Sequence, residues 1–357
     1  MTFSFGSRSK VSVERLEMEL TSACDHRCAH CYVVWNANRL SKERYPKGQL
    51  ETPRFMDMMT KAVSESGASH LTLTGGEPLL RKDVKEIIAH AGRLVSSVRL
   101  VSNGSHISSD MAKWLGQNRV KSAQLTLLSQ RRDIHNRLKG AECFDDTVRA
   151  IVDLKEVGIL VNICFVAMKE NWAELEGVME LAYALGVRQI AYNRMSPTGW
   201  AVDEIERLMP SPEQIEDNLR CADTLGPKLG IKVMTAMPIP PCLIRIHKFK
   251  NVRFGFCSAG SSKPNYVLDA LGNVRSCNLS SRILGNILEQ PFQKILKHQY
   301  IKELGRRVPK VCIGCFYENR CRGGCKESGQ ATYGSLDDLD PFVQFAMSEM
   351  PNKKRIS

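Results

Sequence analysis

The sequence reads Cys24-Asp25-His26-Arg27-Cys28-Ala29-His30-Cys31 where its first predicted strand ends, and this cysteine loop (residues 24–31) decides the fold. Three thiols in eight residues cannot all pair as disulfides, because an odd number leaves one over. Thiolates are soft ligands that suit iron–sulfur chemistry, and three of them leave one iron of a cuboidal cluster free for an outside ligand. An open metal position indicates catalysis rather than a structural role.

Strand and helix patterns alternate around this loop. Expected strands cover residues 16–20, 70–74, 97–101, 123–128, 160–167 and 188–193, and expected helices cover 53–66, 83–94, 109–117, 144–157 and 172–185. The alternation predicts an α/β fold with a parallel sheet that curls into a partial (β/α)6 barrel. Loops after the strands carry the chemistry in such barrels, and the cysteine loop follows the first strand.

The pattern changes at Pro238-Ile239-Pro240-Pro241, a cluster of breakers that marks a boundary. Beyond it the expected strands shorten to 266–269 and 274–277, with a turn between them. We therefore predict a barrel over residues 1–237, a small cysteine-rich domain over 238–345 and a basic C-terminal tail over 346–357.

The chain of 357 residues contains 13 cysteines. Residues 1–10 lack the apolar core of a signal peptide, and no run of about 18 apolar residues predicts a membrane span. We therefore expect a cytoplasmic protein without a membrane partner, whose cysteines bind metal or act in catalysis rather than form disulfides.

A second cysteine pattern, Cys312-x2-Cys315-x5-Cys321-x3-Cys325, lies in the small domain. Four cysteines at such spacings indicate a metal site, and zinc is the first choice from the spacing alone. Three more cysteines lie upstream of it: Cys242, Cys257 and Cys277. The remaining three fit no such spacing and are expected to be small buried residues: Cys143, Cys164 and Cys221.

The cysteine loop after the first strand, with Gly75-Gly76-Glu77 after the second, resembles the radical S-adenosylmethionine (radical SAM) superfamily. The resemblance implies a [4Fe–4S] cluster on Cys24, Cys28 and Cys31, whose remaining iron is chelated by S-adenosylmethionine (SAM). It also implies reductive cleavage of SAM to a 5′-deoxyadenosyl radical that abstracts hydrogen from a substrate.

The resemblance further implies a set of SAM contacts at the ends of strands: Thr74, Gly75, Gly76, Glu77, Asn103, Thr126, Lys139 and Asn193. Glycines let the backbone approach a ligand closely, and Glu77 is able to accept hydrogen bonds from the SAM ammonium. Lys139 stands where relatives often have a carboxylate-binding arginine, and lysine supplies the charge without the two-pronged geometry.

The small domain resembles the SPASM extension of this superfamily, which holds two auxiliary [4Fe–4S] clusters, so three clusters are expected. By resemblance, Cys242, Cys257, Cys277 and Cys325 bind auxiliary cluster I, and Cys312, Cys315 and Cys321 bind auxiliary cluster II. No cysteine follows Cys325, whereas the family pattern supplies a final one there. Asp337, Asp338 or Asp340 is the expected fourth ligand of cluster II, with water or an open iron as the alternatives.

The formal net charge of +12 raises the question of a nucleic-acid partner. That charge counts every cysteine as neutral, and binding of the clusters to thiolates lowers it to about +7. The basic residues are also largely scattered along the chain. We therefore do not expect nucleic acid as a partner, and a non-enzymatic metal protein that binds nucleic acid is the remote alternative.

Residues 124–129 and 145–147 resemble superfamily members that act on peptides. The leading hypothesis is a radical SAM/SPASM oxidoreductase that installs a crosslink, an epimerisation or an oxidation in a ribosomally made peptide. The alternative is a radical SAM dehydrogenase or other modifier of a small molecule or a protein side chain. Because few residues precede the first strand, a separate peptide-recognition protein is an expected partner. A reductant such as flavodoxin or ferredoxin is a second expected partner. No catalytic side chain is predicted.

Overall fold

The computed structural model describes residues 13–36, 45–259 and 264–349 and is built on a single sheet. The sheet has 11 strands in the order β11-β10-β9-β1-β2-β3-β4-β5-β6-β7-β8. Pairing is parallel from β9 through β1 to β8, and antiparallel from β9 through β10 to β11. The strands are β1 (Arg15–Glu19), β2 (His70–Thr74), β3 (Ser97–Ser102), β4 (Val120–Thr126), β5 (Leu160–Ala167), β6 (Gln189–Arg194), β7 (Lys232–Thr235), β8 (Val252–Phe254), β9 (Tyr266–Leu268), β10 (Asn273–Arg275) and β11 (Gly285–Asn286).

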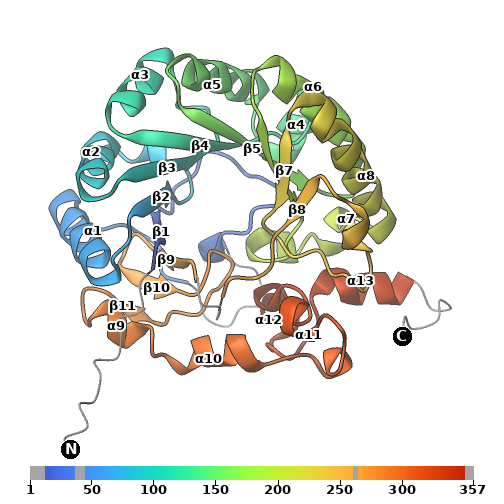
Figure 1. Ribbon diagram of the computed structural model, residues 1–357. Helices are drawn as coiled ribbons and strands as arrows, with labels where there is room; N and C mark the ends of the chain where they lie inside the picture. The colour runs from blue at the N-terminus through green and yellow to red at the C-terminus, as the bar shows by residue number, and fades with distance from the viewer. Residues whose placement is uncertain (1–12, 37–44, 260–263, 350–357) are drawn as a thin grey trace, which may run out of the picture.

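The helices of the first two thirds of the chain lie around the outside of the curved sheet, and the last helices of the chain lie below it in Figure 1. They are α1 (Thr52–Ser66), α2 (Val84–Leu94), α3 (Ser109–Gln117), α4 (Arg132–Lys139), α5 (Phe144–Glu156), α6 (Leu175–Ala184), α7 (Ile205–Leu208) and α8 (Pro212–Leu229), followed by α9 (Phe292–Ile295), α10 (Gln299–Arg306), α11 (Glu318–Cys321), α12 (Lys326–Tyr333) and α13 (Pro341–Glu349). Strand side chains alternate between two faces, and the fully buried apolar face contributes Leu16, Met18, Leu73, Leu100 and Ile163 to the main core. Burial of this face holds the helices on the sheet.

The α/β prediction is confirmed, and the six expected strands and their helices occur with small shifts at the ends. Two parallel strands, β7 and β8, and helix α8 were not predicted. The start of α8 carries a sequence signal that was not used: Ser211 is the N-cap, Pro212 is the first helical residue, and Gln214 completes a reciprocal capping box with Ser211. Strand β8 follows the predicted boundary at 238 and still pairs with β7, so the division into domains stays a prediction.

Helix α13 covers the beginning of the predicted basic tail, and residues 350–357 lie outside the described residues. None of the helices in the described part of the chain is both long enough and apolar enough to cross a membrane.

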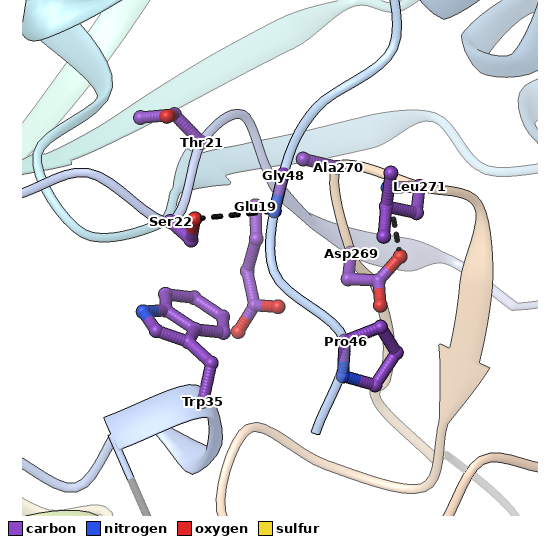
Figure 2. Close-up of a pocket in the computed structure, with 9 residues that line it drawn as sticks. All are labelled: Glu19, Thr21, Ser22, Trp35, Pro46, Gly48, Asp269, Ala270 and Leu271. Atoms are coloured by element: carbon purple, nitrogen blue, oxygen red, sulfur yellow. Dashed lines mark hydrogen bonds between the residues drawn. The ribbon is translucent and has the colours of Figure 1, made fainter. Parts of the chain in front are cut away.

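A buried ion pair fastens the C-terminal hairpin to the first barrel strand. Arg275 of β10 pairs with Glu19 of β1, and both side chains are almost fully buried. Arg275 Nη1 also donates to the carbonyl of Ser280 at 2.9 Å. Figure 2 shows the Glu19 side chain between Trp35 and Asp269, in a small pocket directly before the cysteine loop. The hairpin and the strand that leads into the cysteine loop are therefore held together by charge as well as by pairing.

Replacing Arg275 by Met is expected to destabilise the protein by about 3 to 5 kcal/mol, because the buried Glu19 carboxylate loses its partner. The measurement is anaerobic urea denaturation followed by far-ultraviolet circular dichroism. The matched control is Arg220→Gln on α8, whose ion pairs with Glu216 and Asp217 are exposed and contribute little to stability. Equal urea midpoints for the two variants would contradict the role given to Arg275.

Candidate functional site

The cysteine loop is packed against the loop that follows β2, backbone against backbone. Gly76 N–H donates to the Thr21 carbonyl at 2.9 Å, and Glu77 N–H donates to the Ala23 carbonyl at 2.7 Å. A Cβ added to Gly76 would lie 2.1 Å from the Ala23 carbonyl oxygen. Gly75 has φ +145°, and a Cβ there would lie 2.5 Å from the Thr21 oxygen. These two glycines therefore allow two protein loops to meet, a role that the sequence did not reveal.

Two further glycines let other loops reach the cysteine loop. Gly140 ends α4 with φ +61°, and an added Cβ would lie 2.6 Å from the Arg27 carbonyl oxygen. Gly199, beyond β6, has φ +58°, and an added Cβ would lie 2.8 Å from the Cys31 carbonyl oxygen. Two backbone hydrogen bonds join these loops to the cysteine loop: Ala29 N–H donates to the Leu138 carbonyl, and Ala201 N–H donates to the Cys31 carbonyl. The loops that follow β2, α4 and β6 thus fix the conformation of residues 24–31.

Asn103 at the end of β3 orients the first turn of the cysteine loop. Its Nδ2 donates to Asp25 Oδ1 at 2.8 Å, and its backbone N–H donates to Glu77 Oε2 at 2.7 Å. His106 Nε2 lies 2.7 Å from the other Asp25 oxygen. Burial opposes ionisation of Asp25, yet the hydrogen bonds from His106 and Asn103 hold the pKa of that carboxyl below its usual value. Asp25 and His106 belong to the site and were not singled out from the sequence.

Glu77 is fully buried, and its carboxylate is engaged by the protein. Besides Asn103, the Ser102 hydroxyl and the Leu79 N–H donate to it, at 2.9 and 3.1 Å. Burial raises the pKa of this carboxyl, and these hydrogen bonds lower it. The structure therefore gives Glu77 a role in joining the loops after β2 and β3. The expected contact with an ammonium group stays a prediction.

Lys139, at the end of α4, and Thr126, at the end of β4, are predicted SAM contacts whose side chains donate no hydrogen bond to another described side chain. Lys139 is 3% exposed. Burial and, as the second cause, the Lys139 charge together lower the pKa of His30 to about 3. Burial, as the largest cause, and the Lys139 charge, as the second, also lower the pKa of His26, to about 4. At neutral pH both imidazoles are therefore neutral, and Lys139 supplies positive charge beside the thiols.

Asn193 is engaged within the fold. Its Oδ1 accepts hydrogen bonds from the backbone N–H groups of Ala236 and Met237, both at 3.0 Å, and its Nδ2 donates to Cys164 Sγ at 3.6 Å. Cys164 is buried on β5, as expected. These bonds fix the path of the chain after β7, and the expected adenosine contact of Asn193 stays a prediction.

The inner face of the barrel carries polar side chains that sequence reasoning missed. Glu17, Thr72 and Arg99 are neighbours across β1, β2 and β3. Arg99 Nη2 donates to Gln124 Oε1 at 2.6 Å, whereas Arg99 Nε and the buried Asn162 Oδ1 have no hydrogen-bond partner among the described residues. Polar residues at alternate strand positions are the signal that would have found this layer. Partnerless buried polar atoms indicate room for a ligand.

The cysteines of the small domain form two groups. Burial raises the pKa of Cys277, and the neighbouring charges of Glu327, Cys257 and Cys325 add to this effect. We call Cys257, Cys277 and Cys325 the hairpin triad, and Cys312, Cys315 and Cys321 the C-terminal triad.

Cys242 lies with the C-terminal triad. Although the residue as a whole is exposed, desolvation of its sulfur by the neighbouring loops and the nearby cysteines together raise the thiol pKa to about 12, and the cysteines with the largest effect are Cys321, Cys312 and Cys315. The expected place of Cys242 among the ligands of auxiliary cluster I stays a prediction.

The donor set fits iron–sulfur clusters. Among residues 13–36, 45–259 and 264–349, no three Cys, His, Asp or Glu side chains converge as they would on a single metal ion. In a cuboidal cluster each thiolate binds its own iron, so its ligands stand farther apart than those of one ion. Thiols are the donors that such clusters take, and the cysteine loop, the hairpin triad and the C-terminal triad each supply three.

The family model of the radical SAM superfamily matches residues 18–182. The mycofactocin maturase MftC of Mycolicibacterium smegmatis is 27% identical over 343 residues, which cover 91% of this chain and 81% of that protein. The AdoMet-dependent heme synthase of Methanosarcina barkeri is 25% identical and covers 94% of this chain and 96% of its own. The solved structure of SuiB from Streptococcus suis, bound to the precursor peptide SuiA, has a TM-score of 0.73 at 14% identity and covers 92% of this chain and 75% of that one.

Proposed function

The chain is an enzyme of the radical SAM superfamily, and from that premise we propose that it modifies a ribosomally made peptide by hydrogen abstraction, as a crosslink, an epimerisation or an oxidation. The observation that supports the chemistry is the packing of three loops around the cysteine loop at the carboxyl ends of the barrel strands. The observation that supports a peptide is the likeness to the PqqA peptide cyclase of Gluconobacter oxydans, which is 25% identical over 92% of this chain.

In this proposal Cys24, Cys28 and Cys31 hold the cluster that binds SAM, and Lys139 neutralises the SAM carboxylate. Thr126, at the end of β4, lies on the inner face of the barrel and contacts the ligand from below. When bound, the reduced cluster and SAM supply a 5′-deoxyadenosyl radical. The protein positions this chemistry over the barrel interior and keeps water away from it.

The substrate is proposed to occupy the polar interior of the barrel. Glu17 and Arg99 offer opposite charges there, and Asn162 offers an unpartnered amide oxygen. Burial raises the pKa of Glu17, and the Arg275 and Arg99 charges lower it again. Paired charges of this kind recognise polar side chains and backbone amides of a peptide.

The wider proposal includes three [4Fe–4S] clusters, a flavodoxin or ferredoxin as reductant and a separate peptide-recognition protein. A cytoplasmic location belongs to it as well, because thiols stay reduced there. The small-molecule alternative is kept because the heme synthase of M. barkeri matches this chain at almost full length.

Replacing Lys139 by Met is expected to weaken SAM binding about 10- to 100-fold, since a hydrogen bond to a charged group contributes about 1.5 to 3 kcal/mol. Lys139→Arg, which keeps the charge, should bind within a few-fold of the wild type. Anaerobic equilibrium dialysis with labelled SAM gives the dissociation constants. Unchanged affinity in the Met variant would remove Lys139 from the site.

Anaerobic incubation with SAM, dithionite and the peptides encoded nearest the gene, followed by mass spectrometry, tests the proposed function. Loss of two hydrogens identifies a crosslink or an oxidation. An unchanged mass in water with gain of one deuterium in D2O identifies epimerisation. The Cys24→Ala/Cys28→Ala/Cys31→Ala variant is the matched control. Formation of 5′-deoxyadenosine without a change in any peptide would favour the small-molecule alternative.

A further inference from the structure

Cys242 stands at the tip of a turn that the protein holds in place. Leu243 N–H and Ile244 N–H both donate to the Pro240 carbonyl, at 3.1 and 3.2 Å, and Cys242 itself is exposed. At the start of the turn the Pro238 carbonyl accepts a hydrogen bond from Arg194 Nε at 3.0 Å. Arg194 ends β6 and is fully buried, so the turn is fixed to a rigid part of the barrel.

The same arginine fixes the C-terminal cysteine run. Arg194 forms a fully buried ion pair with Asp340, and Asp340 Oδ2 accepts the Cys325 N–H at 2.7 Å. Asp340 N–H donates in turn to the carbonyl of Gly323, and a Cβ added to Gly323 would lie 3.8 Å from Cys312 Sγ. The turn that presents Cys242 and the run that contains the C-terminal triad therefore share one anchor.

Two of the three aspartates expected to complete the C-terminal triad, Asp337 and Asp340, have other partners. Asp340 Oδ2 is engaged by Arg194 and Cys325, and its Oδ1 accepts the Phe342 N–H at 3.0 Å. Asp337 pairs with Arg307 at 2.8 Å on the surface. The charge of Asp338 contributes to the raised pKa of Tyr333, after burial and the charge of Asp340. A thiolate is also a better ligand for iron in such clusters than a carboxylate.

We propose that Cys242, upstream in the chain, is the fourth thiolate ligand of the auxiliary cluster held by the C-terminal triad. The proposal rests on the auxiliary clusters of the proposed function, and not on the identity of the substrate. In this proposal Cys242 is not a ligand of auxiliary cluster I, to which the resemblance assigned it.

The hairpin triad is then left with three thiolates. Beside it lies Lys326, whose side chain is 4% exposed and whose Nζ has no hydrogen-bond partner among the described residues. Its neighbours include Cys257. A buried ammonium near Cys257 fits the negative charge that a cluster would bring there.

The test uses the full chain in the Cys24→Ala/Cys28→Ala/Cys31→Ala background, so that only the auxiliary clusters report. One parent lacks hairpin ligands (Cys257→Ala/Cys277→Ala), and the other lacks C-terminal ligands (Cys312→Ala/Cys315→Ala). Each parent, reconstituted anaerobically, should keep about four irons. Cys242→Ala is then added to each, and iron, sulfide and the electron paramagnetic resonance spectrum of the reduced protein are compared.

Adding Cys242→Ala should remove the remaining iron, or change its spectrum, only in the parent that lacks hairpin ligands. Non-additive effects of this kind identify groups that act as one unit. The reverse result, with the effect confined to the other parent, would overturn the proposal. Cys221→Ala, a half-buried cysteine of α8 outside both triads, should change neither parent.

Circular dichroism checks that each parent is folded. If one parent fails to fold, the Cys242→Ala single variant still decides, because Mössbauer spectra should show an altered C-terminal cluster and an unaltered hairpin cluster. A wild-type protein with only about four irons would overturn the inference as well. If the protein contains about twelve irons but modifies no peptide, the proposed peptide substrate is rejected and the proposed role of Cys242 is not.

Discussion

Replacing Cys24, Cys28 and Cys31 by Ala is expected to abolish reductive SAM cleavage and to leave about eight irons, if the proposed three clusters hold about twelve. The physical reason in the proposal is that SAM binds the iron left open by these three thiolates near Lys139, whereas the auxiliary cysteines lie in a separate part of the fold. Liquid chromatography with mass spectrometry measures 5′-deoxyadenosine, and a ferrozine assay measures iron.

Cys221→Ala is the control for this variant, because Cys221 is partly buried on α8 and belongs to no cysteine group. It should form 5′-deoxyadenosine at the wild-type rate. Persistent cleavage in the triple variant would mean that SAM binds at another cluster, and loss of all iron would mean that the three sites do not load independently.

The second large effect is expected for Gly76→Ala. The new Cβ would lie 2.1 Å from the Ala23 carbonyl oxygen, closer than real Cβ atoms approach, and the obstacle is backbone that cannot swing away. The cysteine loop must therefore shift, and both cluster loading and SAM cleavage should fall at least about 100-fold, since misplacement by about 1 Å has that order of effect on catalysis.

Gly116→Ala is the matched control for Gly76→Ala. Gly116 lies within α3, and its added Cβ would make only ordinary contacts at 3.7 Å with Val157. Ala is a better helix former than Gly. The free energy of unfolding of this variant should therefore rise by about 0.5 to 1 kcal/mol, and its activity should stay that of the wild type. Similar activity of the two variants would show that the loop contact at Gly76 is not needed.

The barrel was predictable because strand and helix periods are local properties of the sequence. Leu16 and Met18 alternate with Glu17 and Glu19, and this alternation placed β1 correctly. Strands β7 and β8 were missed because each is short, with 4 and 3 residues, and their pairing is decided by the neighbouring strand rather than by their own pattern.

The site was predictable in its residue types and less so in its contacts. Spacing pointed to the cysteine loop, and the resemblance to a family supplied the expected SAM contacts that follow the strands. The roles of Asn103 and Glu77 depend on hydrogen bonds across 26 positions of sequence, which no local pattern encodes. The position of Cys242 depends on Arg194, which binds both the Pro238 turn and Asp340 through contacts distant in the sequence.

The most direct measurement for the whole account is the formation of 5′-deoxyadenosine by the reconstituted wild-type protein with SAM and dithionite, read together with its iron content. The account predicts about twelve irons per chain and 5′-deoxyadenosine that forms only when reductant is present. A protein that holds zinc, or one loaded with iron that leaves SAM intact under reduction, would contradict it.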